Sequence, residues 1–165
     1  MHDLSLYLLE MLENSVRAGA DRVDVGLVID RSSDELRLTV DDDGHGLTAS
    51  PEQTLDPFYT TKPGKKTGLG LSLLKAEAEA AEGGLDIGPS EYSGGTRVTV
   101  YMRFSHVDRL PLGDVATTMV VMAATNPQIE FTVSLSGDEF EPPLVDAPLA
   151  EGADRLARYT EGLVT

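Results

Sequence analysis

Hydrophobic and polar positions follow a helical period near the N-terminus and alternate in the two segments after it. Over residues 3–18 the apolar side chains gather on one side, and Asp3 is placed to cap a helix. Residues 23–29 and 36–40 alternate apolar and polar side chains. This alternation predicts two strands joined by a turn at 30–34.

The middle of the chain predicts a long loop, a second helix and two further strands. Residues 44–67 carry Gly, Pro and Thr without a sustained period, and loops of that length are usually functional, often as lids. Residues 69–82 are rich in Ala and Leu and predict a helix, whereas 85–88 and 96–104 predict strands. This order of elements predicts an α/β two-layer sandwich, with one mixed, mainly antiparallel sheet and helices on one face.

The composition of the chain changes after residue 105. Residues 114–125 predict a helix, and residues 128–135 alternate cleanly enough to predict a strand. A stretch rich in Pro and acidic residues, 137–150, then predicts a linker before a short helix at about 150–162. We therefore expect a main domain over 1–105 and a small C-terminal extension over 106–165.

Charge and composition narrow the possible functions. The formal net charge of −15 argues against nucleic acid or an anionic membrane as a partner, because phosphate contacts need Lys or Arg. The absence of cysteine excludes disulfides, thiolate metal sites and cysteine nucleophiles. The chain shows neither a signal peptide nor an apolar run approaching about 18 residues, so we expect a cytoplasmic protein.

Two polar side chains share one face of the first predicted helix. Glu10 and Asn14 are four residues apart, which places them within about 40° of each other around the helix axis. Both can therefore reach a common metal ion and phosphate group. The amide oxygen of Asn14 is a hard, neutral ligand of the kind that suits Mg²⁺, although an ordinary surface asparagine fits the same position.

Glycine-rich motifs follow at three places. The pattern Asp42-x-Gly44-x-Gly46 comes directly after a predicted strand, and later segments contain residues 67–71 and 94–96 with paired or spaced glycines. Glycine lets the backbone approach a ligand closely. All four lysines fall within residues 62–75, beside a predicted helix N-terminus where polyphosphate is readily held. Each feature also has a simpler explanation: the Asp42 motif fits an acidic turn, residues 94–96 fit the start of a hairpin, and the lysines fit a solvent-exposed loop.

Taken in order, these motifs resemble those of the GHKL superfamily, which includes gyrase, the Hsp90 chaperones, histidine kinases and mismatch-repair ATPases. The resemblance covers about residues 3–104. It implies the Bergerat-type ATP-binding fold over 1–105, with ATP and Mg²⁺ as cofactors. It also implies that Asn14 binds the metal, that Glu10 is the general base and that Asp42 accepts a hydrogen bond from adenine. Many histidine kinases carry Asn where this chain has Glu10, so the glutamate favours hydrolysis.

The resemblance assigns further nucleotide contacts to the glycine motifs and the residues beside them. These residues are Ala18, Gly44, Gly46, Lys62, Thr67, Gly68, Leu69, Gly70, Leu71 and Thr96. Residues 47–67 would form a lid over the triphosphate, and the Thr96 hydroxyl would support the contact between Asp42 and adenine. The implied activity is ATP hydrolysis or phosphoryl transfer to a partner protein of unknown identity. The alternative is a regulatory binding module that responds to nucleotide with little or no turnover.

Overall fold

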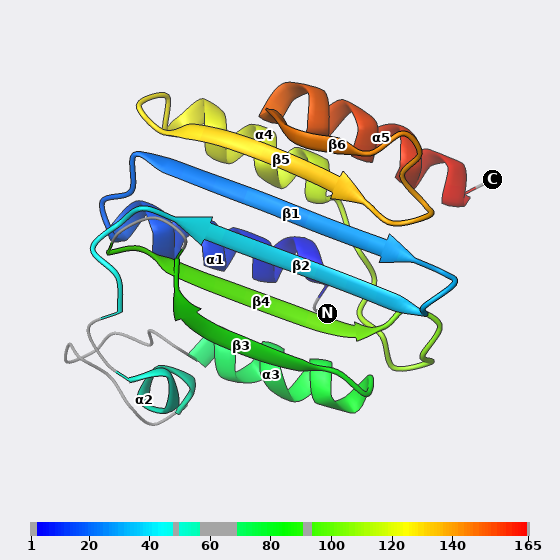
Figure 1. Ribbon diagram of the computed structural model, residues 1–165, viewed down its shortest axis with the longest axis horizontal. Helices are drawn as coiled ribbons and strands as arrows, with labels where there is room; N and C mark the ends of the chain where they lie inside the picture. The colour runs from blue at the N-terminus through cyan, green and yellow to red at the C-terminus, as the bar shows by residue number, and fades with distance from the viewer. Residues whose placement is uncertain (1–2, 48–49, 57–68, 91–93, 165) are drawn as a thin grey trace.

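The computed structural model describes residues 3–47, 50–56, 69–90 and 94–164. In chain order they form α1 (Leu4–Arg17), β1 (Arg22–Asp30), β2 (Glu35–Asp42), α2 (Pro51–Leu55), α3 (Leu69–Ala80), β3 (Gly84–Pro89), β4 (Thr96–Arg103), α4 (Val115–Thr125), β5 (Glu130–Ser136), β6 (Leu144–Pro148) and α5 (Leu149–Val164). The strands of these described segments form one sheet in the order β3-β4-β2-β1-β5-β6. Helices α1, α3, α4 and α5 lie on one face of it (Figure 1).

Helix α1 begins and ends where the sequence predicts. The carboxylate of Asp3 accepts a hydrogen bond from the Leu6 amide at 3.1 Å, which satisfies one of the free donors of the first turn. The helix ends at Ala18, and Gly19 follows with a φ of 74°, a conformation that glycine adopts readily.

None of the helices in the described part of the chain combines the length and the hydrophobicity that crossing a membrane requires.

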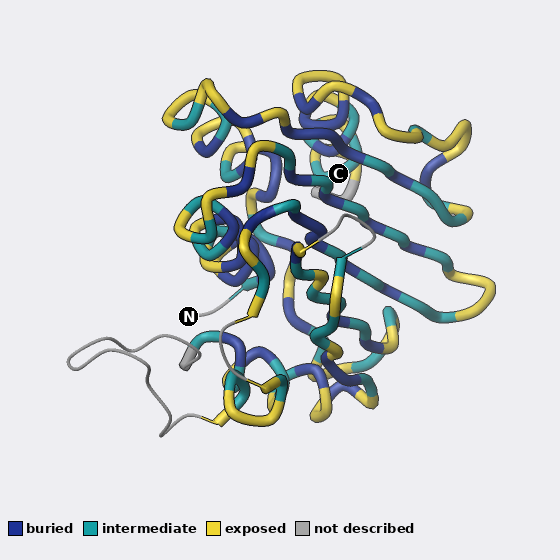
Figure 2. The backbone as a smooth tube through the Cα atoms, turned by 60° about the vertical axis from the view of Figure 1, so that its left-hand side comes forward, coloured by how far each residue is buried: buried dark blue, intermediate teal, exposed yellow. Residues whose placement is uncertain are grey.

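Strand β1 buries every second residue, and β2 does so up to Val40, as their alternation predicts. Figure 2 shows buried and partly exposed positions alternating along them. Strands β1 and β2 form an antiparallel hairpin, and β4 pairs antiparallel with β2. Strand β5 pairs parallel with β1, which makes the sheet mixed. The predicted fold class, a mixed and mainly antiparallel sheet with helices on one face, is confirmed.

Elements within residues 106–164 extend this same sheet. Helix α4 is capped by Asp114 and leads to β5, which lies beside β1 with Val133 opposite Val25. Strand β6 lies inside the stretch that the sequence predicts as a linker, so that prediction was wrong for Leu144–Pro148. The strand is short, irregularly paired and ends in proline. These features are typical of an edge strand, and they hide its alternation in the sequence.

Helix α2 is a second element that the sequence analysis missed. It lies within the predicted loop, beside α3. Ser50 caps it, Pro51 occupies its first turn, and the Gln53 side-chain oxygen accepts a hydrogen bond from the Ser50 amide. This capping box stabilises a helix too short to show a hydrophobic period. Residues 48–49 and 57–67 of the predicted lid lie outside the described residues.

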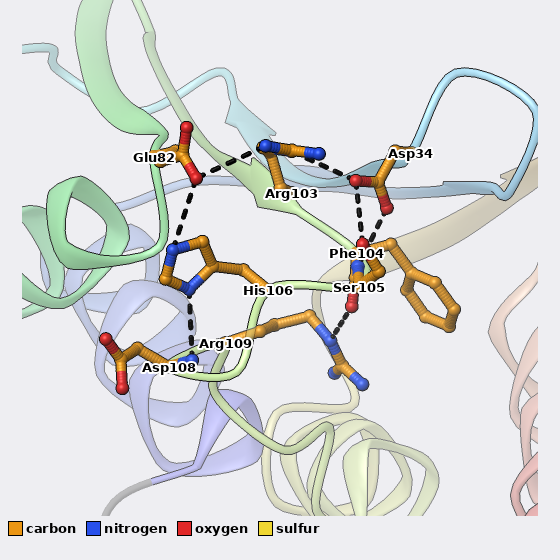
Figure 3. A network of polar contacts seen from close by, with 8 residues as sticks. All are labelled: Asp34, Glu82, Arg103, Phe104, Ser105, His106, Asp108 and Arg109. Atoms are coloured by element: carbon orange, nitrogen blue, oxygen red, sulfur yellow. Dashed lines mark hydrogen bonds and ion pairs between the residues drawn. The ribbon is translucent and has the colours of Figure 1, made fainter.

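A polar network fixes the end of the sheet that carries the β1–β2 turn (Figure 3). Arg103, the last residue of β4, pairs with Asp34 of the turn at 3.0 Å and with Glu82 after α3 at 3.2 Å. His106 also contacts Glu82, at 3.3 Å from Nε2. Ser105 donates to Asp34 from both its amide and its hydroxyl, each at 2.8 Å. The network thus ties the segment that leads to α4 onto α3 and the β1–β2 hairpin.

Candidate functional site

The motif residues that the structure describes come together at the end of the sheet opposite to that network. The C-terminal end of α1, the end of β2, the beginning of β4 and the beginning of α3 meet at the left of Figure 1. The strand register places Asp42 beside Val23 of β1 on one side and Thr96 of β4 on the other. Segments far apart in the sequence therefore surround the end of β2.

The Asp42 carboxylate is buried at the centre of this arrangement, with the residue 5% exposed. Its Oδ2 accepts a 2.7 Å hydrogen bond from the Ser15 hydroxyl. Its Oδ1 accepts from the amides of Gly44 at 2.9 Å and Thr96 at 3.4 Å. All three donors are neutral. Because an ionised carboxylate has about four acceptor positions, this one can accept one more hydrogen bond from a ligand.

The glycines of the Asp42–Gly46 motif and of the motif at residues 94–96 make room for protein backbone around Asp42. A Cβ on Gly44 would lie 2.7 Å from the Cβ and carbonyl oxygen of Ala18, and the adjoining His45 amide donates to that same oxygen at 2.9 Å. A Cβ on Gly46 would lie 2.4 Å from the carbonyl oxygen of Gly94. The glycines therefore allow three segments to pack closely beside the buried carboxylate.

The predicted catalytic and metal-binding residues stay at the surface of α1. Glu10 is exposed and Asn14 is half-buried. The guanidinium of Arg17, one turn further along α1, donates a hydrogen bond to the Asn14 side-chain oxygen. The Glu10 carboxylate extends to the first turn of α3, where a Cβ on Gly70 would lie 1.3 Å from its Oε2. Glu10 thus bridges from α1 to the beginning of α3.

The glycine motif at residues 67–71 is only partly described. Lys62, Thr67 and Gly68 lie outside the described residues, and Leu69 begins α3. The Leu71 side chain is buried in the core, at 6% exposure. Only its backbone therefore remains for a ligand contact.

Sequence reasoning missed two side chains that organise this site. Ser15 lies on the apolar face of the helix, yet its hydroxyl orients Asp42. Tyr7 is buried between α1 and α3 and donates to the Glu77 carboxylate at 3.2 Å. Burial, followed by the negative charge of Glu77, raises the pKa of Tyr7 to about 12. Their positions on the buried face of the helix were visible in the sequence, but their polar partners were not.

Carboxylate and histidine side chains of the described segments do not form a metal cage. Among the described residues, no group of three or more His, Cys, Asp or Glu side chains is placed to hold a metal ion. The Asn14 side-chain amide supplies an oxygen ligand at the surface of the site. This donor suits a metal ion that takes most of its ligands from phosphate and water, as Mg²⁺ does.

Comparison with known sequences agrees with these features. The sequence profile of the family described as histidine kinase-, DNA gyrase B-, and HSP90-like ATPase matches residues 2–106. The sensor protein kinase PilS of Pseudomonas aeruginosa is 34% identical over 116 residues, which cover 66% of this chain and 21% of that protein. A probable C4-dicarboxylate sensor kinase of Halalkalibacterium halodurans is 29% identical over 106 residues, covering 61% and 20%. The chain thus spans about a fifth of these relatives.

Comparison with solved structures extends the likeness of fold to the C-terminal residues. A crystal structure described as the N-terminal domain of a DNA repair protein superposes with a TM-score of 0.55 at 16% identity. The match covers 90% of this chain and 55% of that one, so it reaches beyond the residues of the family profile. The family resemblance inferred from the motifs is confirmed by the profile match. The chain belongs to the family of histidine kinase-, DNA gyrase B- and HSP90-like ATPases.

Proposed function

We propose that this site binds ATP together with Mg²⁺ and either hydrolyses the nucleotide or transfers its terminal phosphoryl group to a partner protein. The observation that carries the proposal is the buried Asp42 carboxylate, held by three neutral donors and able to accept one more hydrogen bond. Family membership supports nucleotide as the ligand, because the family is one of ATPases.

Asp42 would select adenine over guanine. The exocyclic amine of adenine donates a hydrogen bond to the carboxylate, whereas guanine presents a carbonyl oxygen at the same place. Two acceptors facing each other in a buried site would leave the carboxylate without its partner, at a cost of about 1–3 kcal/mol or more. Ser15 and the Gly44 amide keep the carboxylate oriented toward the ligand.

Asn14 and Glu10 would serve the phosphate end. The amide oxygen of Asn14 would bind Mg²⁺ after the Arg17 guanidinium moves away from it. Bound Mg²⁺ would neutralise charge on the phosphate oxygens. Glu10, one turn earlier on the same face, would take a proton from the attacking water, whose oxygen then bonds to the terminal phosphorus as the bond to the leaving ADP oxygen breaks. Glu10 is exposed and therefore accessible to that water.

Calorimetry with a matched pair of aspartate variants tests the nucleotide proposal. We expect the unmodified chain to bind Mg-ATP more tightly than Mg-GTP. Asp42→Asn should weaken Mg-ATP binding by roughly 10–100-fold, since the amide cannot offer the same acceptor pair. Asp43→Asn is the control, because the Asp43 carboxylate accepts instead from the Asp21 and Arg22 amides at 2.8 and 2.9 Å. Equal loss in both variants, or no loss in Asp42→Asn, would contradict the proposal.

A second measurement tests turnover. Glu10→Ala should retain Mg-ATP affinity and abolish phosphate release, because it removes the base and leaves the adenine contacts in place. Release should be followed for the chain alone and with candidate partner proteins. If the unmodified chain binds Mg-ATP but neither releases nor transfers phosphate under any of these conditions, the chain is a nucleotide-responsive binding module instead.

A further inference from the structure

The contact between Glu10 and Gly70 depends on the absence of a side chain at position 70. A Cβ there would lie 1.3 Å from Oε2, 2.3 Å from Cδ and 2.8 Å from Oε1 of Glu10. These are the three nearest atoms, so the carboxylate is what fills the space beside Gly70. Any other residue at this position would force the carboxylate to move.

This contact belongs to an antiparallel interface between α1 and α3. Tyr7 and Glu10 lie three residues apart on α1, whereas Glu77 and Gly70 lie seven residues, or about two turns, apart on α3. Tyr7 contacts Glu77, and Glu10 contacts Gly70. One end of the interface is therefore fixed by a buried tyrosine, and the other end brings an exposed carboxylate onto the first turn of α3.

We propose that Gly70 is a positioning residue for Glu10, because its missing Cβ lets the carboxylate lie on α3. The position of the base is then coupled to the position of the first turn of α3. The contact itself follows from the geometry, whereas its effect on turnover rests on the proposed function. Because Glu10 is an exposed and flexible side chain, a methyl group at position 70 displaces the carboxylate without disrupting the core.

A double-mutant cycle in nucleotide-free protein tests the contact directly. The four proteins are the unmodified chain, Gly70→Ala, Glu10→Ala and the double variant, and the readout is the midpoint of thermal unfolding. Alanine favours a helix over glycine, so Gly70→Ala should raise the midpoint when Glu10 is absent. With Glu10 present, the displaced carboxylate should reduce or reverse that rise.

Gly162→Ala is the matched control for this cycle. Gly162 also lies in a helix, and a Cβ there would meet nothing within 4 Å. It should shift the midpoint equally with and without Glu10. An equal shift for Gly70→Ala in the two backgrounds would overturn the proposal, whatever the activity of the protein.

The rate of phosphate release distinguishes a positioning role of Gly70 from a purely structural one. At saturating Mg-ATP, Gly70→Ala should lower the rate of phosphate release by roughly tenfold or more, because the base is displaced. Glu10→Asp, which is one methylene shorter, should recover part of that release when combined with Gly70→Ala. Unchanged release in Gly70→Ala would overturn the positioning role. If the unmodified chain releases no phosphate, this counts against the proposed activity. The contact between Glu10 and Gly70 would then be tested by the unfolding midpoints alone.

Discussion

The Ser15 hydroxyl donates a 2.7 Å hydrogen bond to Oδ2 of Asp42, joining α1 to the end of β2. Both residues are buried, at 2% and 5% exposure. The next residue back along α1 is Asn14, which faces the surface instead. Two neighbouring residues of α1 therefore have different roles. Ser15 holds the buried Asp42 carboxylate, and Asn14 presents its amide oxygen at the surface.

Replacing Ser15 with alanine should destabilise the fold and weaken nucleotide binding together. The variant leaves a buried carboxylate oxygen without its donor, which costs about 1–3 kcal/mol. Urea unfolding should show this loss, and calorimetry should show weaker Mg-ATP binding. Ser33→Ala, at an exposed position of the β1–β2 turn, is the control and should change neither quantity. Unaltered stability of Ser15→Ala would mean that the hydrogen bond does not hold Asp42.

Gly95→Ala should be far more damaging than Gly88→Ala. A Cβ on Gly95 would lie 1.8 Å from the carbonyl oxygen of Asp42 and 3.0 Å from the Cα of Asp43, and backbone atoms cannot move aside cheaply. Overpacking of this kind costs about 1–3 kcal/mol or more. A Cβ on Gly88 in β3 would meet nothing within 4 Å. Thermal unfolding of the two variants checks this prediction. Equal unfolding midpoints would show that the close packing at Gly95 does not matter for stability.

The elements with a strong period were predictable because burial alone decides them. Helix α1 and strands β1, β2 and β4 each place their apolar side chains toward one core, so a single sequence shows their period. The motif around Asp42 was recognisable in the sequence for a different reason, and its role stays a prediction. Asp42 and its glycines are adjacent in sequence, and the contact between the Asp42 carboxylate and the Gly44 amide needs only the turn after β2.

The features that the sequence did not reveal depend on distant partners. Nothing within residues 130–136 shows that β5 pairs parallel with β1. The polar role of Ser15 needs Asp42, which is 27 residues away, and the close fit at Gly70 needs Glu10 from another helix. Short elements such as α2 and β6 carry too few residues for a period to be visible.

Asp34→Asn should lower stability at neutral pH but not in acid. Hydrogen bonds from Ser105, followed by contact with Arg103, lower the pKa of Asp34 in the folded chain below its usual 3.8. A carboxyl group with a lowered folded pKa stabilises the fold above the unfolded pKa and loses that contribution as pH falls. Asparagine also tolerates the positive φ of 55° at this position, so the variant changes charge with little backbone strain.

Urea unfolding at pH 7 and at pH 3 checks this prediction. The difference between Asp34→Asn and the unmodified chain should shrink at the lower pH. Asp86→Asn, at an exposed position on β3, should show no comparable difference at either pH. A gap for Asp34→Asn that is as large at pH 3 as at pH 7 would show that the charge of Asp34 is not what stabilises the network.

Tyr7→Phe should flatten the loss of stability in alkali. Burial and the nearby Glu77 carboxylate raise the pKa of Tyr7 from 10.0 to about 12. Between these values the unfolded chain releases the phenolic proton while the folded chain keeps it. The folded state then binds more protons, so stability falls as pH rises, by at most ~2–3 kcal/mol. The pKa of Tyr159 is also raised to about 12, so Tyr7→Phe should remove only part of this slope. Urea unfolding at several pH values between 9 and 11 measures this slope. If the free energy of unfolding falls equally with pH in the variant and the unmodified chain, ionisation of Tyr7 does not cause the loss of stability.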